Sequence, residues 1–167
     1  MIQVLTQEDF KKLFEAHFAP LRNYLFFRSG DTGLATDIAQ ETFIKIWEKQ
    51  VQIKHETVKG LLYKVANDLF ISNYRKEQRS FNFFNSYQFD GTSRSPEDEM
   101  EFNQLKERYK KALEQMPENQ RTVFLMSRVD NLKYYEIAEM TGISLKAVEK
   151  RMHKALKFLQ VNLKTNE

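Results

Sequence analysis

Apolar residues recur at spacings of three and four through nearly every segment of this 167-residue chain, and no segment shows the alternation of a strand. Spacings of three and four place side chains on one face of an α-helix, whereas strict alternation indicates a half-buried strand. The first such stripe consists of Phe10, Leu13, Phe14, His17, Phe18, Leu21 and Leu25. The sequence therefore predicts an all-α fold.

Three helices are expected in the first half of the chain. Thr6 and Asp9 form a capping-box-like start, and Pro20 should kink or split the first helix. After a break at 29–31, a second helix is predicted over 32–49, followed by a polar loop over 52–56. A third helix should end near Arg79, with a buried side formed by Val58, Leu61, Leu62, Val65, Leu69 and Ser72. These helices can share one core, which predicts a first domain over residues 1–79.

The segment 80–95 has the composition of a flexible linker, because Asn, Ser, Gly and Asp dominate it and the helical period is lost. It nevertheless contains five aromatic residues: Phe81, Phe83, Phe84, Tyr87 and Phe89. Either these rings pack back on a domain or a partner orders them. Beyond the linker, Ser95 is a predicted N-cap and Pro96 a first helical residue. A second small helical domain is therefore expected over residues 96–167.

The helices of the second domain are predicted from the same helical spacing of apolar residues. A stripe of Phe102, Leu105, Tyr109, Leu113 and Met116 should be buried, and Pro117 should end that helix. A shorter helix through Val123, Phe124 and Met126 then reaches a turn at residues 130–131.

The end of the chain, YYEIAEMTGISLKAVEKRMHKALKFL from Tyr134, fits a helix-turn-helix. Ala138 is small where the two helices cross, and Gly142 suits a left-handed turn. Apolar contacts are expected from Ile137, Ile143, Val148 and Met152. The second helix of this motif usually enters the major groove of DNA. The candidate DNA-reading residues are Ser144, Lys146, Ala147, Glu149, Lys150, Arg151, His153 and Lys154.

Within that helix, different side chains suit different parts of DNA. Lys146, Glu149 and Lys150 are expected to reach base edges, since Lys can donate to guanine and Glu can accept from cytosine. Phosphate contacts are expected from Arg151, Lys154 and Lys157, with pairing inside the domain as the alternative for Arg151.

Composition narrows the function classes. The chain has no cysteine, which excludes disulfides, cysteine–zinc sites and thiol chemistry. His17, His55 and His153 lie far apart without metal-ligand spacing, and no Gly-rich phosphate loop is present. No enzyme, metal or cofactor is therefore predicted, and no small-molecule substrate. Without a long apolar run or a signal-peptide pattern, a cytoplasmic protein with no direct membrane insertion is expected.

The run DIAQETFIKIWEK, residues 37–49, is the most informative stretch. Ile38, Ala39, Thr42 and Ile46 can face a core, which leaves the polar residues of the run on the opposite side. With the aromatic helix before it, the basic helix after it and the terminal helix-turn-helix, the chain resembles sigma factors of the extracytoplasmic-function (ECF) type. The resemblance implies that core RNA polymerase binds Asp37, Gln40, Glu41, Phe43, Lys45 and Trp47, with a place in the core as the alternative for Trp47.

The same resemblance implies that the third helix, VKGLLYKVANDLFISNYRKEQR, contacts the downstream box of promoter DNA. The matching candidates are Lys59, Tyr63, Lys64, Asn67, Asp68, Arg75, Lys76 and Arg79. Leu61, Asp68 and Ser72 depart from the family's usual residues, which affects the base that is read. The family also implies a base-capturing pocket at 52–56, a linker that runs through the polymerase, and an anti-sigma factor as partner.

Two other classes of function fit parts of the sequence. A stand-alone helix-turn-helix regulator without polymerase docking would explain the second domain, but it needs a receiver or ligand-binding domain for which no strand pattern exists. A helical adaptor that binds only protein would explain the periodicity and leave the basic helix unused. Binding to core RNA polymerase separates the sigma factor from the stand-alone regulator, and salt-dependent binding to duplex DNA separates it from the adaptor.

Overall fold

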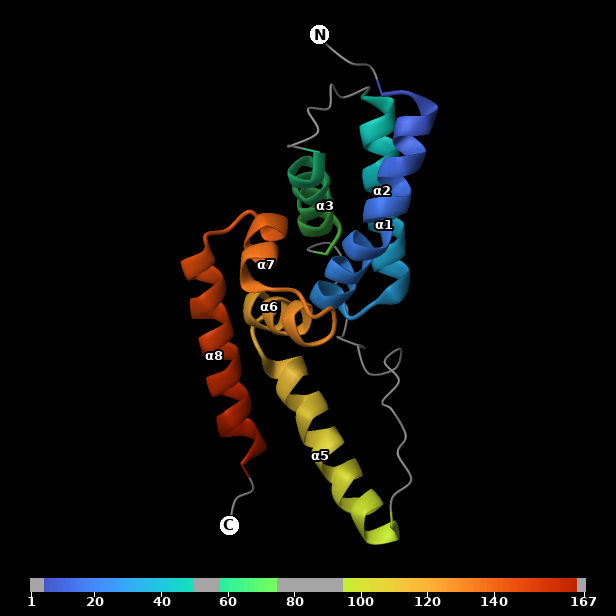
Figure 1. Cartoon of the computed structure of the whole chain (residues 1–167). Helices are drawn as coiled ribbons and strands as arrows, with labels where there is room; N and C mark the ends of the chain where they lie inside the picture. The colour runs from blue at the N-terminus through green and yellow to red at the C-terminus, as the bar shows by residue number, and fades with distance from the viewer. Residues whose placement is uncertain (1–4, 50–57, 75–94, 165–167) are drawn as a thin grey trace.

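The computed structural model describes residues 5–49, 58–74 and 95–164, and every regular element in these ranges is a helix, which confirms the all-α prediction (Figure 1). The helices are α1 (Gln7–Ser29), α2 (Thr32–Glu48), α3 (Val58–Tyr74), α5 (Pro96–Gln115), α6 (Glu118–Arg128), α7 (Tyr134–Thr141) and α8 (Leu145–Leu163). We call α1–α3 the first helical domain and α5–α8 the second. No helix among the described residues combines the length and apolar character needed to cross a membrane.

The ends of the first helices follow the predicted capping chemistry. The Thr6 hydroxyl accepts a hydrogen bond from the Asp9 backbone N–H at 3.1 Å, which starts α1. Pro20 lies inside α1, and the helix continues through it. Of the two predicted effects of Pro20, a split is therefore wrong and a kink remains compatible with the structure. Gly30 ends the helix with a left-handed φ of 65°, and the Asp31 carboxylate then caps α2.

The first helical domain packs α1 against α2 along their length, with α3 against both (Figure 1). Leu21, Leu25 and Ile38 are among its fully buried residues. The buried side of α3 contains the predicted Val58, Leu62 and Leu69, and in addition Tyr63, Ala66 and Phe70. Leu61 and Val65 are only partly buried, and Ser72 is exposed, so its predicted burial is wrong. The reason is the helical phase, which places Ser72 on the side opposite Phe70.

In the second helical domain, α6 lies at the centre and all six residues 121–126 are buried. The N-cap of α5 is Ser95, as predicted, with Pro96 in the first turn. Leu113 and Met116 are buried, but Leu105 is 47% exposed, which contradicts the predicted burial. The cause is architectural, because the N-terminal part of α5 extends beyond the other helices (Figure 1).

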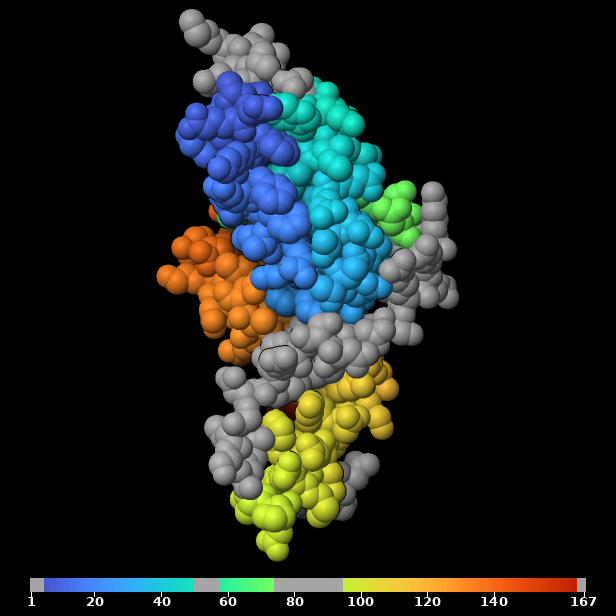
Figure 2. Space-filling model, turned by 90° about the vertical axis from the view of Figure 1, so that its right-hand side faces the viewer, coloured from blue at the N-terminus to red at the C-terminus, as the bar shows by residue number. Residues whose placement is uncertain are grey.

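The two helical domains are docked on each other. Helix α6 packs against α1, and α7 packs against α3. Their buried residues join in one continuous cluster. Figure 2 shows the orange residues of the second domain directly beside the blue residues of α1. The predicted loop at 52–56 and almost all of the predicted linker, with its aromatic residues, lie outside the described residues.

Candidate protein and nucleic-acid interfaces

Helix α2 has a polar, exposed face opposite its buried face. Ile38, Ala39, Thr42 and Ile46 are buried, as predicted from the helical period. On the other side Asp37, Gln40 and Glu41 are all exposed, whereas Lys45 is partly exposed. Carboxylates and an amide side by side can accept charge-assisted hydrogen bonds from arginine forks of a partner. The arrangement fits a protein-docking surface.

Phe43 does not belong to that exposed surface. Only 2% of it is exposed, because its ring packs edge-on against Phe10 and Phe14 of α1, with centroid separations of 6.1 and 5.1 Å. Its predicted direct contact with a partner is therefore wrong for the arrangement described here. Edge-to-face aromatic packing instead makes Phe43 a support that fixes α2 on α1.

Ile44 is an exposed residue of α2 that the sequence reasoning missed. It is 53% exposed and follows Gln40 and Glu41 by one helical turn, a spacing that was readable from the sequence. With the partly buried Trp47 it borders a shallow groove of about 370 Å³ that is completed by Gln7, Phe10 and Glu48. The Trp47 ring also packs against Phe10, tilted by 59° with the ring centroids 5.1 Å apart, so it belongs to both the core and the groove. An apolar groove beside a polar patch is a common interface design.

The candidate DNA residues of α3 divide into two sets. Lys64 and Asp68 are exposed and Lys59 is partly exposed, so these groups are accessible. Tyr63 and Asn67 lie on the side of α3 that faces the second helical domain: Tyr63 is 4% exposed, and the Asn67 side chain is bonded to Arg28. Arg75, Lys76 and Arg79 lie outside the described residues. Within α3 the structure therefore does not present all candidates on one open face.

Burial changes the titration of several groups near this face. It raises the pKa of the Tyr63 phenol strongly, with smaller contributions from Tyr24 and Asp130. Burial also raises the pKa of Tyr24, against the opposing effect of the Arg28 guanidinium. On the other side of the domain, burial and the charge of Lys59 lower the pKa of His17. Tyr63 is therefore neutral under ordinary conditions and suited to hydrogen bonding or stacking rather than to charge.

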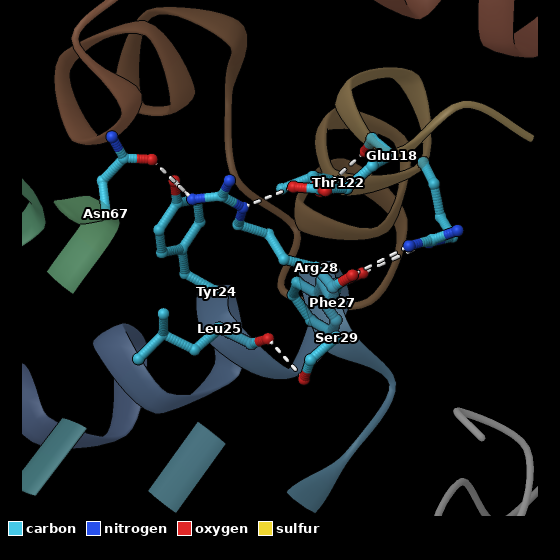
Figure 3. Close-up of polar contacts among 9 residues, drawn as sticks. Tyr24, Leu25, Phe27, Arg28, Ser29, Asn67, Glu118 and Thr122 are labelled. Carbon is cyan, nitrogen blue, oxygen red and sulfur yellow. Dashed lines mark hydrogen bonds and ion pairs between the residues drawn. The ribbon is translucent and has the colours of Figure 1, made fainter. Parts of the chain in front are cut away.

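Arg28 of α1 joins both helical domains through its guanidinium. Figure 3 shows its side chain between Asn67 of α3 and Glu118 of α6. Its Nε donates to Glu118 Oε1 at 2.6 Å, while its Nη1 donates to Asn67 Oδ1 at 2.6 Å and to the Tyr24 hydroxyl at 3.1 Å. The guanidinium also lies 4.1 Å from the centroid of the Phe70 ring. No local sequence signal marks Arg28, because its partners Asn67 and Glu118 lie 39 and 90 residues away.

Arg121 supplies a second connection between the domains. Its guanidinium donates to the Arg28 carbonyl at 2.8 Å and to the Phe27 carbonyl at 3.4 Å, at the C-terminal end of α1. A cation is favourable there, because the last carbonyls of a helix lack partners and carry the negative end of its dipole. The same side chain also donates to the Leu113 and Met116 carbonyls, both at 3.4 Å. Arg121 therefore ties α1 to the α5–α6 corner.

The helix-turn-helix forms as predicted. Gly142 ends α7 with a φ of 70°, and the Ser144 hydroxyl accepts from the Ala147 backbone N–H at 3.1 Å to start α8. Ile137, Val148 and Met152 are buried between the helices, and Ile143 and Ala138 are partly buried. The N-terminal turns of α8 therefore have a fixed direction relative to the rest of the domain.

Most of the candidate DNA residues on α8 are free to meet a partner. Exposed residues are Ser144, Lys146, Glu149, Lys150, His153 and Lys154, whereas Ala147 and Arg151 are partly buried. Arg151 lies near enough to Tyr24 for its charge to lower the pKa of that phenol, so it leans toward the first helical domain. An exposed helix with four lysine, arginine or histidine side chains over 150–154 suits a phosphate backbone. Among the described residues, no three His, Asp or Glu side chains gather where a metal ion would bind.

Two family models match separate parts of this chain. Residues 13–80 match the model for "Sigma-70 region 2" and residues 104–159 match the model for "Sigma-70, region 4". The sigma factor YlaC of Bacillus subtilis is 26% identical over 162 residues, covering 94% of this chain and 93% of its own length. The ECF sigma factor SigM of the same organism is 25% identical over 154 residues, covering 89% of this chain and 93% of its own length.

A solved structure shares the fold. The sigma factor RpoE from Bartonella quintana, determined in complex with the anti-sigma factor NepR, superposes with a TM-score of 0.61 at 22% identity. The match covers 96% of this chain and 99% of that chain. Since the two family models together span both helical domains, the chain belongs to the sigma-70 family of RNA polymerase sigma factors and is of the extracytoplasmic-function type.

Proposed function

We propose that this sigma factor binds core RNA polymerase through the exposed face of α2 and directs it to promoters whose two boxes are read by α3 and α8. The division of α2 into a buried face and an exposed acidic and amide face carries the proposal. Asp37, Gln40 and Glu41 make no contribution to the core, yet they lie together beside the groove at Ile44. A partner that presents arginine side chains fits such a surface.

For the upstream box, we assign α8 to duplex DNA. Lys146, Glu149 and Lys150 are exposed at the N-terminal part of the helix, where a helix-turn-helix meets base edges. Lys154 and Lys157, further along and also exposed, suit phosphates. Arg151 keeps the phosphate role only in an arrangement in which it turns away from the first helical domain.

For the downstream box, we assign α3 to the separated strands. Lys59 and Lys64 suit a strand backbone, while the Tyr63 ring and the Asn67 amide suit an unpaired base. The exposed Asp68 is retained as a candidate for a hydrogen bond to a base amino group. In this scheme the chain performs no chemistry of its own, and the polymerase synthesises RNA.

An anti-sigma factor is proposed as a further partner. The homologous fold of RpoE was determined in complex with one, which supports this assignment. The exposed faces of α2 and α8 are surfaces that such a partner would have to cover in order to silence the protein. In the absence of that partner, we expect the protein to act in the cytoplasm together with the polymerase.

The test of the proposed function is binding of the purified protein to core RNA polymerase. A variant that combines Gln40→Ala with Glu41→Lys should lose affinity by about a hundredfold or more, because a like charge then faces the arginines expected on the partner. Affinity can be measured by fluorescence anisotropy of the labelled protein at a fixed salt concentration.

Lys150→Ala is the matched control on the other surface. It should retain polymerase affinity and change only which upstream-box duplex is preferred, because it removes one base-edge donor. If the α2 variant binds polymerase as tightly as the wild type, the assigned docking face is wrong. If the folded wild type does not bind polymerase at all, the sigma factor function itself is contradicted in favour of a stand-alone DNA-binding regulator.

A further inference from the structure

A shallow groove on the second helical domain combines apolar and positively charged side chains. It has a volume of about 400 Å³ and is lined mainly by α8, with Gln120 contributed by the start of α6. Val161, which is 64% exposed, and the partly buried Phe158 supply its apolar surface. The exposed side chains of Lys154 and Lys157 lie beside them. Such a groove suits a helix that presents an apolar side chain among carboxylates.

The positive charge of this part of α8 is uncompensated along the chain. Residues 150–164 contain four lysines and one arginine, and no acid. Within the described ranges, neither Lys154 nor Lys157 forms an ion pair. Positive charge beside an exposed valine favours an acidic partner over a neutral or basic one.

The N-terminal end of α5 has the complementary chemistry. Residues 96–105 contain no base and four acids, which are Glu97, Asp98, Glu99 and Glu101. Met100 lies among these acids and is 61% exposed. The helix dipole explains acids in the first turn of α5, but it does not explain an exposed methionine on a segment that extends beyond the other helices (Figure 1). A methionine side chain is flexible and polarisable, so it adapts well to a shallow apolar groove.

The acidic end of α5 and the groove are far apart within one molecule. Helix α5 is continuous over its 20 residues, and Leu113 and Met116 are buried near its C-terminal end, where the chain turns toward α6 and Gln120. At 1.5 Å per residue, Met100 lies roughly 24 Å along the helix from Met116. The acidic end therefore reaches such a groove only on another molecule.

We propose that the acidic end of α5 docks in the α6–α8 groove of a second copy of this chain, and that two such contacts close a symmetric dimer. Each copy offers both surfaces, so a twofold axis satisfies both contacts at once. Met100 covers the apolar part of the groove, while Glu97 and Glu101 pair with Lys154 and Lys157. Because each contact has few apolar groups and depends on exposed ion pairs, the dimer is weak, reversible and sensitive to salt.

The dimer uses side chains that the proposed function gives to DNA. Lys154 and Lys157 are candidate phosphate contacts of α8, so a second copy and duplex DNA compete for them. Only this consequence rests on the proposed function; the dimer itself does not. A duplex DNA added to the free protein should therefore return the dimer to the monomer.

Sedimentation velocity of the purified full chain measures the dimer. At low salt the average mass should rise toward two chains over about a hundredfold range of protein concentration, and added salt should reverse the rise. Two variants reverse the charge of one surface each: Glu97→Lys with Glu101→Lys on α5, and Lys154→Glu with Lys157→Glu on α8. Each should weaken self-association by about tenfold or more, because like charges then face each other in both contacts.

A mixture of the two variants gives a result that a folding defect would not imitate. Each variant alone should be monomeric, but the mixture should form a dimer, because one contact then has both charges reversed and the other has both wild-type charges. Glu8→Lys with Glu15→Lys on α1 is the matched control, since it makes the same change of charge at exposed residues and also includes the first turn of a helix. This control should associate like the wild type.

The outcomes separate the dimer from the proposed function. A wild type that stays monomeric at every concentration overturns the inference and leaves the groove to an acidic segment of another protein. Self-association that neither α5 nor α8 variant weakens, or a mixture of the two that stays monomeric, also overturns it. A duplex that binds the protein and leaves the dimer intact overturns the shared use of Lys154 and Lys157. Failure of the folded monomer to bind any duplex counts against the proposed function and leaves the mixing result in force.

Discussion

At the scale of single residues, the arginines show how location decides the role of the same side chain. Arg121 is 5% exposed and donates to backbone carbonyls from both helical domains. Arg128, at the other end of α6, is exposed to solvent. A buried guanidinium is tolerated only where several acceptors surround it, and the corner between α1, α5 and α6 provides them.

Replacement of Arg121 by methionine should destabilise the protein. The apolar side chain fills similar space, but it leaves the carbonyls of Phe27, Arg28, Leu113 and Met116 without this donor, so a loss of about 2–3 kcal/mol in unfolding free energy is expected. Arg128→Met on the same helix should change stability by less than about 0.5 kcal/mol. Urea denaturation followed by circular dichroism measures both, and equal stabilities of the two variants would contradict the structural role of Arg121.

Sequence reasoning recovered the residues whose roles are set locally. Gly142 and Ser144 follow from turn and cap chemistry, and the two faces of α2 follow from the helical period. It failed for Arg28 and Arg121, because their partners across the interface lie 90 and 93 residues away in the chain. It also failed for Phe43, which lies between the two faces of α2, where periodicity alone does not decide between core and surface.

At the scale of elements, helix ends were easier to predict than the buried side of each helix. Ser95 and Ser144 cap α5 and α8 as their sequence signals indicate. The buried sides of α3 and α5 deviate from the prediction at Ser72, because of its helical phase, and at Leu105, because α5 extends beyond its neighbouring helices there (Figure 1).

Two glycines in different elements should respond oppositely to alanine. Gly142 has a φ of 70°, so Gly142→Ala should cost about 1 kcal/mol through backbone strain, although a Cβ there would meet no atom within 4 Å. Gly60 lies within α3, and a Cβ there also meets nothing within 4 Å, so Gly60→Ala should stabilise by about 0.5–1 kcal/mol. Thermal unfolding of both variants tests the pair. A stabilised Gly142→Ala would show that the turn does not need a left-handed residue.

At the scale of the whole molecule, the arrangement of the two helical domains was out of reach of the sequence. Each domain has its own amphipathic helices, and those patterns specify which residues are buried without specifying the partner domain. The docked surfaces are mixed, with Arg28, Glu118 and Asp130 among apolar residues, so no apolar stripe marks them. Docking through such a mixed surface is expected to depend on pH, and Asp130 offers a way to measure this dependence.

Docking of the domains should weaken as the pH rises through the weakly acidic range. Burial raises the pKa of Asp130 above the ordinary value of 3.8, despite the opposing hydrogen bond from Asn23. A carboxyl with a raised pKa binds its proton more tightly in the docked form, so docking is strongest when Asp130 is protonated and is reduced once the pH passes the raised value. Tyr63, which faces the same region, stays neutral throughout, because burial raises its pKa as well.

Asp130→Asn isolates this effect, since asparagine keeps an acceptor for Asn23 and has no charge to lose. Energy transfer between dyes attached through Ala16→Cys on α1 and Gln160→Cys on α8, both exposed positions, can be recorded from about pH 4 to 7. It should fall with rising pH in the otherwise wild-type protein and stay nearly level in the variant. At neutral pH the variant should be the more strongly docked of the two. An identical pH profile for both proteins would mean that Asp130 is not desolvated by docking, and the interface would then owe its strength to apolar packing, the Arg28–Glu118 pair and Arg121.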